Sequence, residues 1–204
     1  MHVWRDRLSR WFTPLARQCP LSPNAISFIA LTINLAAAAL LLAGASRSIF
    51  FLVAISFVIT AGFADAFDGI VARVQGKESR FGDFLDHVAD RISDTTLAAC
   101  WLIGNHVREG LVVAATIVVM LNGYIGTQIE ATWRERSYQS LGRGEFVLAL
   151  VALPIVSYIL FSNGWDALRF GGATIAEWLG LLLLVFGLLG IVQRFAVARR
   201  MERS

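Results

Sequence analysis

The stretch from Asp65 to Asp94 is the feature that most constrains how this chain can fold. It carries six aspartates and lies between long apolar segments of the 204-residue sequence. Carboxylates inside a membrane-embedded segment are energetically costly and are usually kept for a function. The fold must therefore bring these aspartates together with groups that compensate their charge.

The apolar segments indicate a membrane protein, because 56% of the residues are hydrophobic and they come in long blocks. A block of about 20 apolar residues is long enough to span a hydrocarbon core of about 30 Å. We therefore predict an all-α membrane protein with six transmembrane helices, at about residues 23–44, 49–73, 81–103, 110–133, 143–162 and 173–197.

The N-terminal residues 1–20 are predicted to form a juxtamembrane amphipathic helix that lies on the membrane surface. Their apolar side chains recur at helical spacing and so share one face. Residues 21–204 are predicted to form a single membrane domain. Its first helix has Ser22 as a candidate N-cap and Pro23 at the first helical position. The apolar face of the N-terminal helix comprises Trp4, Leu8, Trp11, Phe12 and Leu15.

The basic residues predict the orientation in the membrane. Six crossings place both termini on one side, and that side collects most of the arginines, whereas the opposite loops hold only Arg47, Arg108 and Arg169. By the positive-inside rule, both termini and the acidic stretch near them are cytoplasmic. The formal net charge of +3 is then explained by topology and membrane lipid, and we expect no nucleic-acid partner.

The aspartates are spaced so that two pairs face each other across a helical hairpin. Asp65 and Asp68 are three residues apart on one predicted helix, and Asp86 and Asp90 are four apart on the next. At about 1.5 Å per residue, both pairs lie roughly 10–15 Å from the connecting loop. Four carboxylates without histidine or cysteine favour Mg²⁺ or Mn²⁺, with Ca²⁺ also possible, and they suffice for two ions. Such a pair of ions suits phosphoryl transfer.

The small residues between the aspartates have two readings. They leave space for a nucleotide diphosphate to approach the helix backbone, or they allow close packing between helices. Arg73 follows one turn after Gly69 and is placed to reach a phosphate or to pair with an acid. The residues concerned are Gly69, Ala72, Arg73 and Gly82.

Together these positions resemble the complete signature of the class I CDP-alcohol phosphatidyltransferases. The eight matching positions are Asp65-x2-Asp68-Gly69-x2-Ala72-Arg73-x8-Gly82-x3-Asp86-x3-Asp90. The resemblance implies an enzyme of phospholipid biosynthesis that moves a substituted phosphate from a CDP-linked lipid, such as CDP-diacylglycerol, to an alcohol and releases CMP. It also implies a homodimer.

The resemblance further implies roles for the signature residues. The aspartates are implied to bind the metal, and Asp90 is either a ligand or the general base for the acceptor hydroxyl. The remaining residues are implied to line the CDP site. The implied metal ligands are Asp65, Asp68, Asp86 and Asp90, and the implied CDP-site residues are Gly69, Ala72, Arg73 and Gly82.

The acceptor is less well defined by the sequence. A phosphorylated acceptor needs cations near the cytoplasmic end of the site, and Arg134, Arg136 and Arg143 are placed for this, although they equally suit a topology-setting loop. The sequence around Asp86 resembles more closely that of family members that use inositol phosphate as the acceptor. Glycerol-3-phosphate is the alternative acceptor. A cation transporter with an intramembrane carboxylate site explains the aspartates but not the glycines, Ala72 and Arg73 at fixed offsets.

Overall fold

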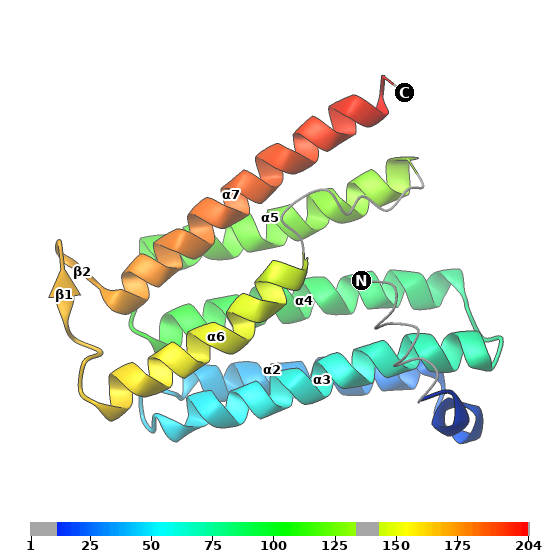
Figure 1. Cartoon of the computed structure of the whole chain (residues 1–204), viewed down its shortest axis with the longest axis horizontal. Coiled ribbons are helices and arrows are strands. Elements are labelled where there is room, and N and C mark those ends of the chain that lie inside the picture. The colour runs from blue at the N-terminus through cyan, green and yellow to red at the C-terminus, as the bar shows by residue number, and fades with distance from the viewer. Residues whose placement is uncertain (1–11, 134–142, 204) are drawn as a thin grey trace.

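The structure is a computed structural model, and it describes residues 12–133 and 143–203. Six long helices run roughly parallel or antiparallel to one another, and a small two-stranded hairpin lies at one end of the bundle (Figure 1). The elements are α2 Pro23–Leu42, α3 Ile49–Val74, α4 Arg80–Gly104, α5 Glu109–Trp133, α6 Arg143–Ser162, β1 Arg169–Phe170, β2 Ala173–Thr174 and α7 Ile175–Met201.

Each of the six predicted apolar segments is a helix, and most of the boundaries agree within two residues. The predicted N-cap of the first helix is confirmed, because the Ser22 hydroxyl accepts a hydrogen bond of 3.2 Å from the backbone N–H of Ala25. Pro23 stands at the start of α2, where its missing N–H is not needed.

The all-α prediction omitted the hairpin β1–β2, which is antiparallel and pairs Arg169 with Thr174. Its turn contains Gly171 and Gly172, whose φ angles of 59° and 83° are in the left-handed region that favours glycine. The last helix therefore begins at residue 175, two residues later than predicted. Thr174 caps it by accepting a hydrogen bond from the backbone N–H of Glu177.

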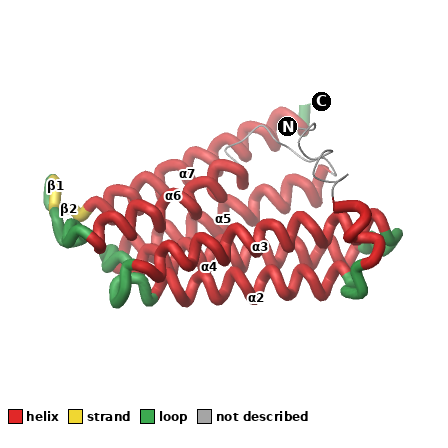
Figure 2. Tube along the Cα trace, turned by 60° about the horizontal axis from the view of Figure 1, so that its bottom comes forward, coloured by secondary structure: helices red, strands yellow, loops and turns green. Residues whose placement is uncertain are grey.

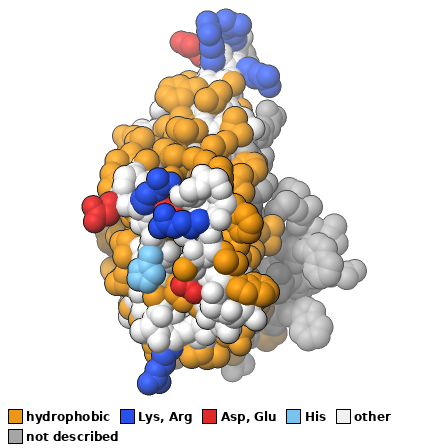
Figure 3. Space-filling view, turned by 90° about the vertical axis from the view of Figure 1, so that its left-hand side faces the viewer, with side chains coloured by type: hydrophobic (Ala, Val, Ile, Leu, Met, Phe, Trp, Pro, Cys, Tyr) orange, Lys and Arg blue, Asp and Glu red, His pale blue; other side chains and the backbone are white. Residues whose placement is uncertain are grey.

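Four helices, α2, α3, α5 and α7, are long and apolar enough to cross a membrane, which indicates an integral membrane protein. The apolar part of α6 is shorter, at Leu148–Ser162, and α4 carries the charged residues of the acidic stretch. Large apolar side chains are exposed on these helices, as a lipid environment requires. Viewed from its hairpin end, the molecule shows charged side chains scattered among hydrophobic and uncharged ones (Figure 3).

Helix α2 is the central support of the site-bearing part of the bundle. It packs against both α3 and α4, whereas α3 and α4 make few close backbone contacts with each other in the described part of the chain. Figure 2 shows these three helices side by side. Helix α5 packs against α4 and α7, and α6 packs against α3. Helix α2 therefore holds α3 and α4 in place relative to each other.

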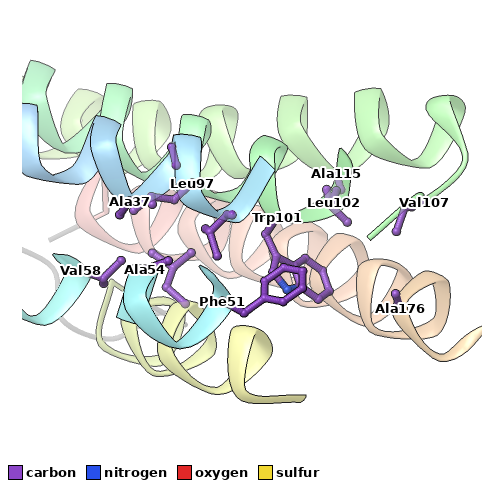
Figure 4. Close-up of a cluster of buried hydrophobic side chains, with 13 residues drawn as sticks. Ala37, Phe51, Ala54, Val58, Leu97, Trp101, Leu102, Val107, Ala115 and Ala176 are labelled. Atoms are coloured by element: carbon purple, nitrogen blue, oxygen red, sulfur yellow. The ribbon is translucent and has the colours of Figure 1, made fainter. Parts of the chain in front are cut away.

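The larger of two apolar clusters in the described residues lies in the half of the bundle away from the acidic stretch. Figure 4 shows its side chains between the helices. Phe51 and Trp101 are its largest side chains, and both are almost completely buried. The Trp101 Nε1–H donates a hydrogen bond of 2.9 Å to the Ser157 hydroxyl on α6. Small residues bring the helices close together, since a Cβ atom at Gly104 would overlap the carbonyl oxygen of Leu41.

The N-terminal segment is helical over residues 12–18, and the rest of the predicted amphipathic helix lies outside the described residues. Its Phe12 ring lies 6.0 Å from the Phe67 ring of α3. The Gln75 side-chain amide donates hydrogen bonds to the carbonyl oxygens of Ala16 and Cys19, at 2.9 and 3.0 Å. These contacts hold the segment against the end of α3.

Candidate metal and nucleotide site

The site is built on the connection between α3 and α4. Gly76, two residues after the end of α3, adopts a φ of 64° and allows the chain to reverse. Ser79 then caps α4 by accepting a hydrogen bond of 3.0 Å from the backbone N–H of Gly82. The two helices therefore run antiparallel from a short loop, and the signature residues on both lie at the same end of the bundle.

Three of the four predicted carboxylates meet across this connection. Asp65 of α3 and Asp86 and Asp90 of α4 each offer a carboxylate oxygen, and these atoms all lie within 4.8 Å of one another. Asp90 is buried, with 6% of its surface exposed, and the other two are half-buried. Three negative charges this close repel one another, and a hard divalent cation with oxygen ligands stabilises them. The residues present therefore fit the predicted Mg²⁺ or Mn²⁺.

The fourth carboxylate, Asp68, is buried but is not part of this group of three. It accepts a hydrogen bond of 2.5 Å from the Ser27 hydroxyl of α2. We predicted four converging carboxylates. In the structure three of them meet, and the fourth, Asp68, is hydrogen-bonded to α2 instead. The spacing within α3 predicted that Asp68 shares a face with Asp65 but carried no information about a partner on α2.

The environment of Gly69 separates the two readings of the small residues. A Cβ atom at Gly69 would meet only the Arg73 Nη1 atom, at 3.8 Å, so no neighbouring helix requires a glycine there. Close helix packing therefore does not explain the glycine at this position. At Gly82, a Cβ would lie 3.2 Å from the Ser79 hydroxyl and 3.4 Å from the Asn24 side chain, so this glycine also has a packing reason. Ala72 is half-buried between them in sequence.

Two positively charged arginines lie against α5, and one of them is next to the carboxylates of the site. Arg91 lies 3.9 Å from the Asp90 carboxylate and 3.7 Å from that of Asp94, and its guanidinium occupies the space beside Gly123. The guanidinium of Arg194, on α7, lies in the same way against Gly126 of α5. The two arginines therefore sit over glycines that are one helical turn apart.

Arg194 is the residue that sequence reasoning missed. It is the single charge within the long apolar run of α7 before the basic C-terminal turn, and a charge in such a run is a functional candidate by default. Of the predicted acceptor residues, Arg134 and Arg136 lie outside the described residues. Arg143 is the first residue of α6, and its side chain is likewise outside them.

The match to known proteins covers most of the chain. A family model described as CDP-alcohol phosphatidyltransferase matches residues 20–193. The phosphatidylinositol phosphate synthase of Mycobacterium tuberculosis is 30% identical over 154 residues, in an alignment that covers 70% of this chain and 65% of that protein. The chain therefore aligns with slightly less than two thirds of the length of this relative.

Two crystal structures of the phosphatidylinositol phosphate synthase of Mycobacterium tuberculosis have a similar fold. The structure in complex with manganese and citrate has a TM-score of 0.67 at 25% identity, over 91% of this chain and 88% of that one. The structure with CDP-DAG bound has a TM-score of 0.64 at 26% identity, over 93% and 94% of the two chains.

Proposed function

The chain belongs to the CDP-alcohol phosphatidyltransferase family, and we propose that it transfers a phosphatidyl group from CDP-diacylglycerol to inositol phosphate and releases CMP. The observation that carries the proposal is the meeting of Asp65, Asp86 and Asp90 within 4.8 Å on two helices that also carry the rest of the signature. The similarity to phosphatidylinositol phosphate synthases supports inositol phosphate as the acceptor.

The four signature aspartates are the proposed metal ligands. Asp65, Asp86 and Asp90 meet directly, and Asp68 lies on the same helix face as Asp65. Four carboxylates suffice for two Mg²⁺ or Mn²⁺ ions. Ions bound there neutralise charge on the diphosphate of the donor and so favour its cleavage.

The nucleotide is proposed to lie against the end of α3, where the backbone is least covered. Gly69 leaves open space, Ala72 adds only a methyl group, and the exposed Arg73 is free to reach a phosphate oxygen. Gly82 lines the facing side on α4. The lipid tails of the donor then extend along the apolar helix surfaces.

Asp90 is the proposed general base. It is the most buried of the three converging carboxylates and faces the side of the site that carries Arg91. A hydroxyl of the acceptor loses its proton to Asp90 while its oxygen bonds to the phosphorus on the lipid side of the diphosphate. The bond from that phosphorus to the bridging oxygen breaks, and CMP leaves with the bonding electrons.

The phosphate of the acceptor is proposed to bind near Arg194. The Arg194 Nε atom is buried and has no hydrogen-bond partner among the described residues, so the guanidinium has a donor that an anion would satisfy. Arg134, Arg136 and Arg143 remain proposed contributors at the mouth of the site. Glycerol-3-phosphate carries the same phosphate and is the alternative acceptor.

The membrane arrangement completes the proposal. Helix α4 has 25 residues, about 37 Å at 1.5 Å per residue, and is enclosed by α2 and α5, two of the apolar helices. We propose that α4 and α6 also cross the membrane, giving six crossings with cytoplasmic termini and a cytoplasmic site. A surface location for the N-terminal helix and a homodimer are part of the same proposal.

The test is a transfer assay on purified protein in detergent with Mg²⁺ or Mn²⁺ and CDP-diacylglycerol. Inositol phosphate, glycerol-3-phosphate and unphosphorylated inositol are supplied in turn, and CMP release is followed. We expect metal-dependent release with inositol phosphate and very little with inositol. Metal-independent release, or no release with any acceptor, contradicts the proposal. Preferred release with glycerol-3-phosphate replaces the proposed acceptor and leaves the reaction class standing.

A further inference from the structure

A polar side chain of helix α2, Ser27, contacts Asp68 of the candidate metal site. Ser27 lies one turn after Pro23, and 8% of its surface is exposed. Its hydroxyl is 2.5 Å from Oδ2 of Asp68, which is equally buried. The contact joins α2, which packs against both site-bearing helices, to a carboxylate of the signature.

The hydrogen-bond geometry identifies the acceptor of the Ser27 proton. The hydroxyl has one proton and two acceptors within reach, Asp68 at 2.5 Å and the Pro23 carbonyl oxygen at 3.2 Å. A charged acceptor at the shorter distance forms the stronger bond, so the proton is donated to Asp68. By contrast, Ser56 and Thr60 of α3 donate to carbonyl oxygens of their own helix.

We propose that Ser27 is a positioning residue for the metal site and acts through Asp68. By holding Oδ2, it fixes the orientation of the Asp68 carboxylate beside Asp65. The inference rests on the proposed function, because it takes Asp68 as a metal ligand. Groups that orient a ligand in this way typically change metal affinity or activity by about 10–100-fold when they are removed.

Burial makes this contact consequential. Without the hydroxyl, the Asp68 oxygen loses its donor in a place that water reaches poorly, and the carboxylate turns toward any other donor available. The three converging carboxylates do not depend on Ser27. The expected consequence is therefore a weakened metal site and not a lost one.

The experiment measures metal binding without substrate or turnover. The full-length protein, purified in detergent and stripped with EDTA, is titrated with Mn²⁺, and free Mn²⁺ is followed by electron paramagnetic resonance. Ser27→Ala is expected to weaken binding by about 10-fold. Ser56→Ala is the matched control, because it removes a serine hydroxyl that bonds only within α3, and it is expected to bind as the wild type does.

A second pair of variants tests whether the loss of binding comes from the missing hydroxyl or from a change in side-chain shape at position 27. Ser27→Thr and Ser27→Val have nearly the same shape and differ in the hydroxyl, so the threonine variant is expected to bind Mn²⁺ several times more tightly than the valine variant. In an Asp68→Asn background, Ser27→Ala is expected to cause no further loss. An equal further loss there overturns the assignment, because Ser27 then acts through another group.

The outcomes distinguish this inference from the function on which it rests. If the wild-type chain binds Mn²⁺ and both Ser27→Ala and Ser27→Val bind it equally well, the role of Ser27 is overturned and the metal site stands. A wild-type chain that binds no Mn²⁺ overturns the metal site and the role of Ser27 with it. If Ser27→Ala fails to fold, the comparison of the threonine and valine variants decides.

Discussion

The two halves of the bundle use the same helices in opposite ways. Around Phe51 and Trp101, α3 and α4 are part of a core of tightly fitted apolar side chains. Around Asp65 and Asp90, the same two helices carry carboxylates that repel one another. The first half specifies how the helices are placed, and the second uses that placement to hold charges together. Stability and activity should therefore respond to different substitutions.

The largest effect is expected at the carboxylates. Asp86→Asn removes one charge from the group of three, and we expect a loss on the order of 1000-fold in kcat/KM, or about 4 kcal/mol of transition-state stabilisation. The thermal unfolding temperature, measured in EDTA, is expected to stay the same or to rise, because repulsion falls. CMP release and differential scanning fluorimetry check the two parts. A variant with full activity would show that Asp86 is not a ligand.

Substitution in the apolar half should show the reverse pattern. Trp101→Ala removes the largest buried side chain and its hydrogen bond to Ser157, and we expect a loss of about 3 kcal/mol in stability. Activity at temperatures well below unfolding should change little. Phe186→Ala on the exposed surface of α7 is the control and should have a small effect. The comparison between halves fails if Trp101→Ala abolishes activity in a folded protein.

The acceptor side gives a smaller and more selective effect. Arg194→Gln keeps hydrogen-bonding capacity but removes the charge, and we expect the KM for inositol phosphate to rise about 10-fold. The KM for CDP-diacylglycerol should be almost unchanged, because α7, which carries Arg194, does not pack closely against α3 in the described part of the chain. Steady-state kinetics with each substrate varied separately measures both. An equal rise in both KM values contradicts a role specific to the acceptor.

The smallest effect is expected where the N-terminal segment meets α3. Gln75→Leu removes two hydrogen bonds to backbone carbonyls, each worth about 1 kcal/mol. Limited proteolysis should then cut residues 12–20 faster, while CMP release falls only a few-fold. Lys77→Leu is a matched control, since it removes only the bond from Lys77 to the Gln75 oxygen. Unchanged proteolysis in Gln75→Leu would show that apolar packing alone holds the segment.

Much of the fold was predictable because apolar length and local capping act within a few residues of each helix. Ser22 and Pro23 identified the start of α2, and the length of the apolar segments identified the six long helices. The hairpin β1–β2 was not predicted, because its strands have only two residues each and its turn depends on positive φ angles at Gly171 and Gly172. No hydrophobic period is visible over so short a span.

The site was predictable where its residues lie on one hairpin and was not where distant helices contribute. Helical spacing placed Asp65, Asp86 and Asp90 on facing sides. The same spacing could not show that Asp68 bonds to Ser27, 41 residues earlier in the chain. The charge of Arg194 within an apolar run is visible in the sequence, but its contact with Gly126 arises only when α7 packs on α5. Such pairings depend on tertiary packing and leave no local pattern.

The connection between α3 and α4 also bears on how the chain folds during synthesis. Its carboxylates lie within 26 residues of sequence, so their contacts are local and form early. Arg194 is made more than a hundred residues after Asp90. Because chains fold from the N-terminal end as they are made, the carboxylates of α3 and α4 can come together before Arg194 has been synthesised. On the proposed function, a chain that still lacks its final helix has the carboxylates but not the arginine proposed for the phosphorylated acceptor.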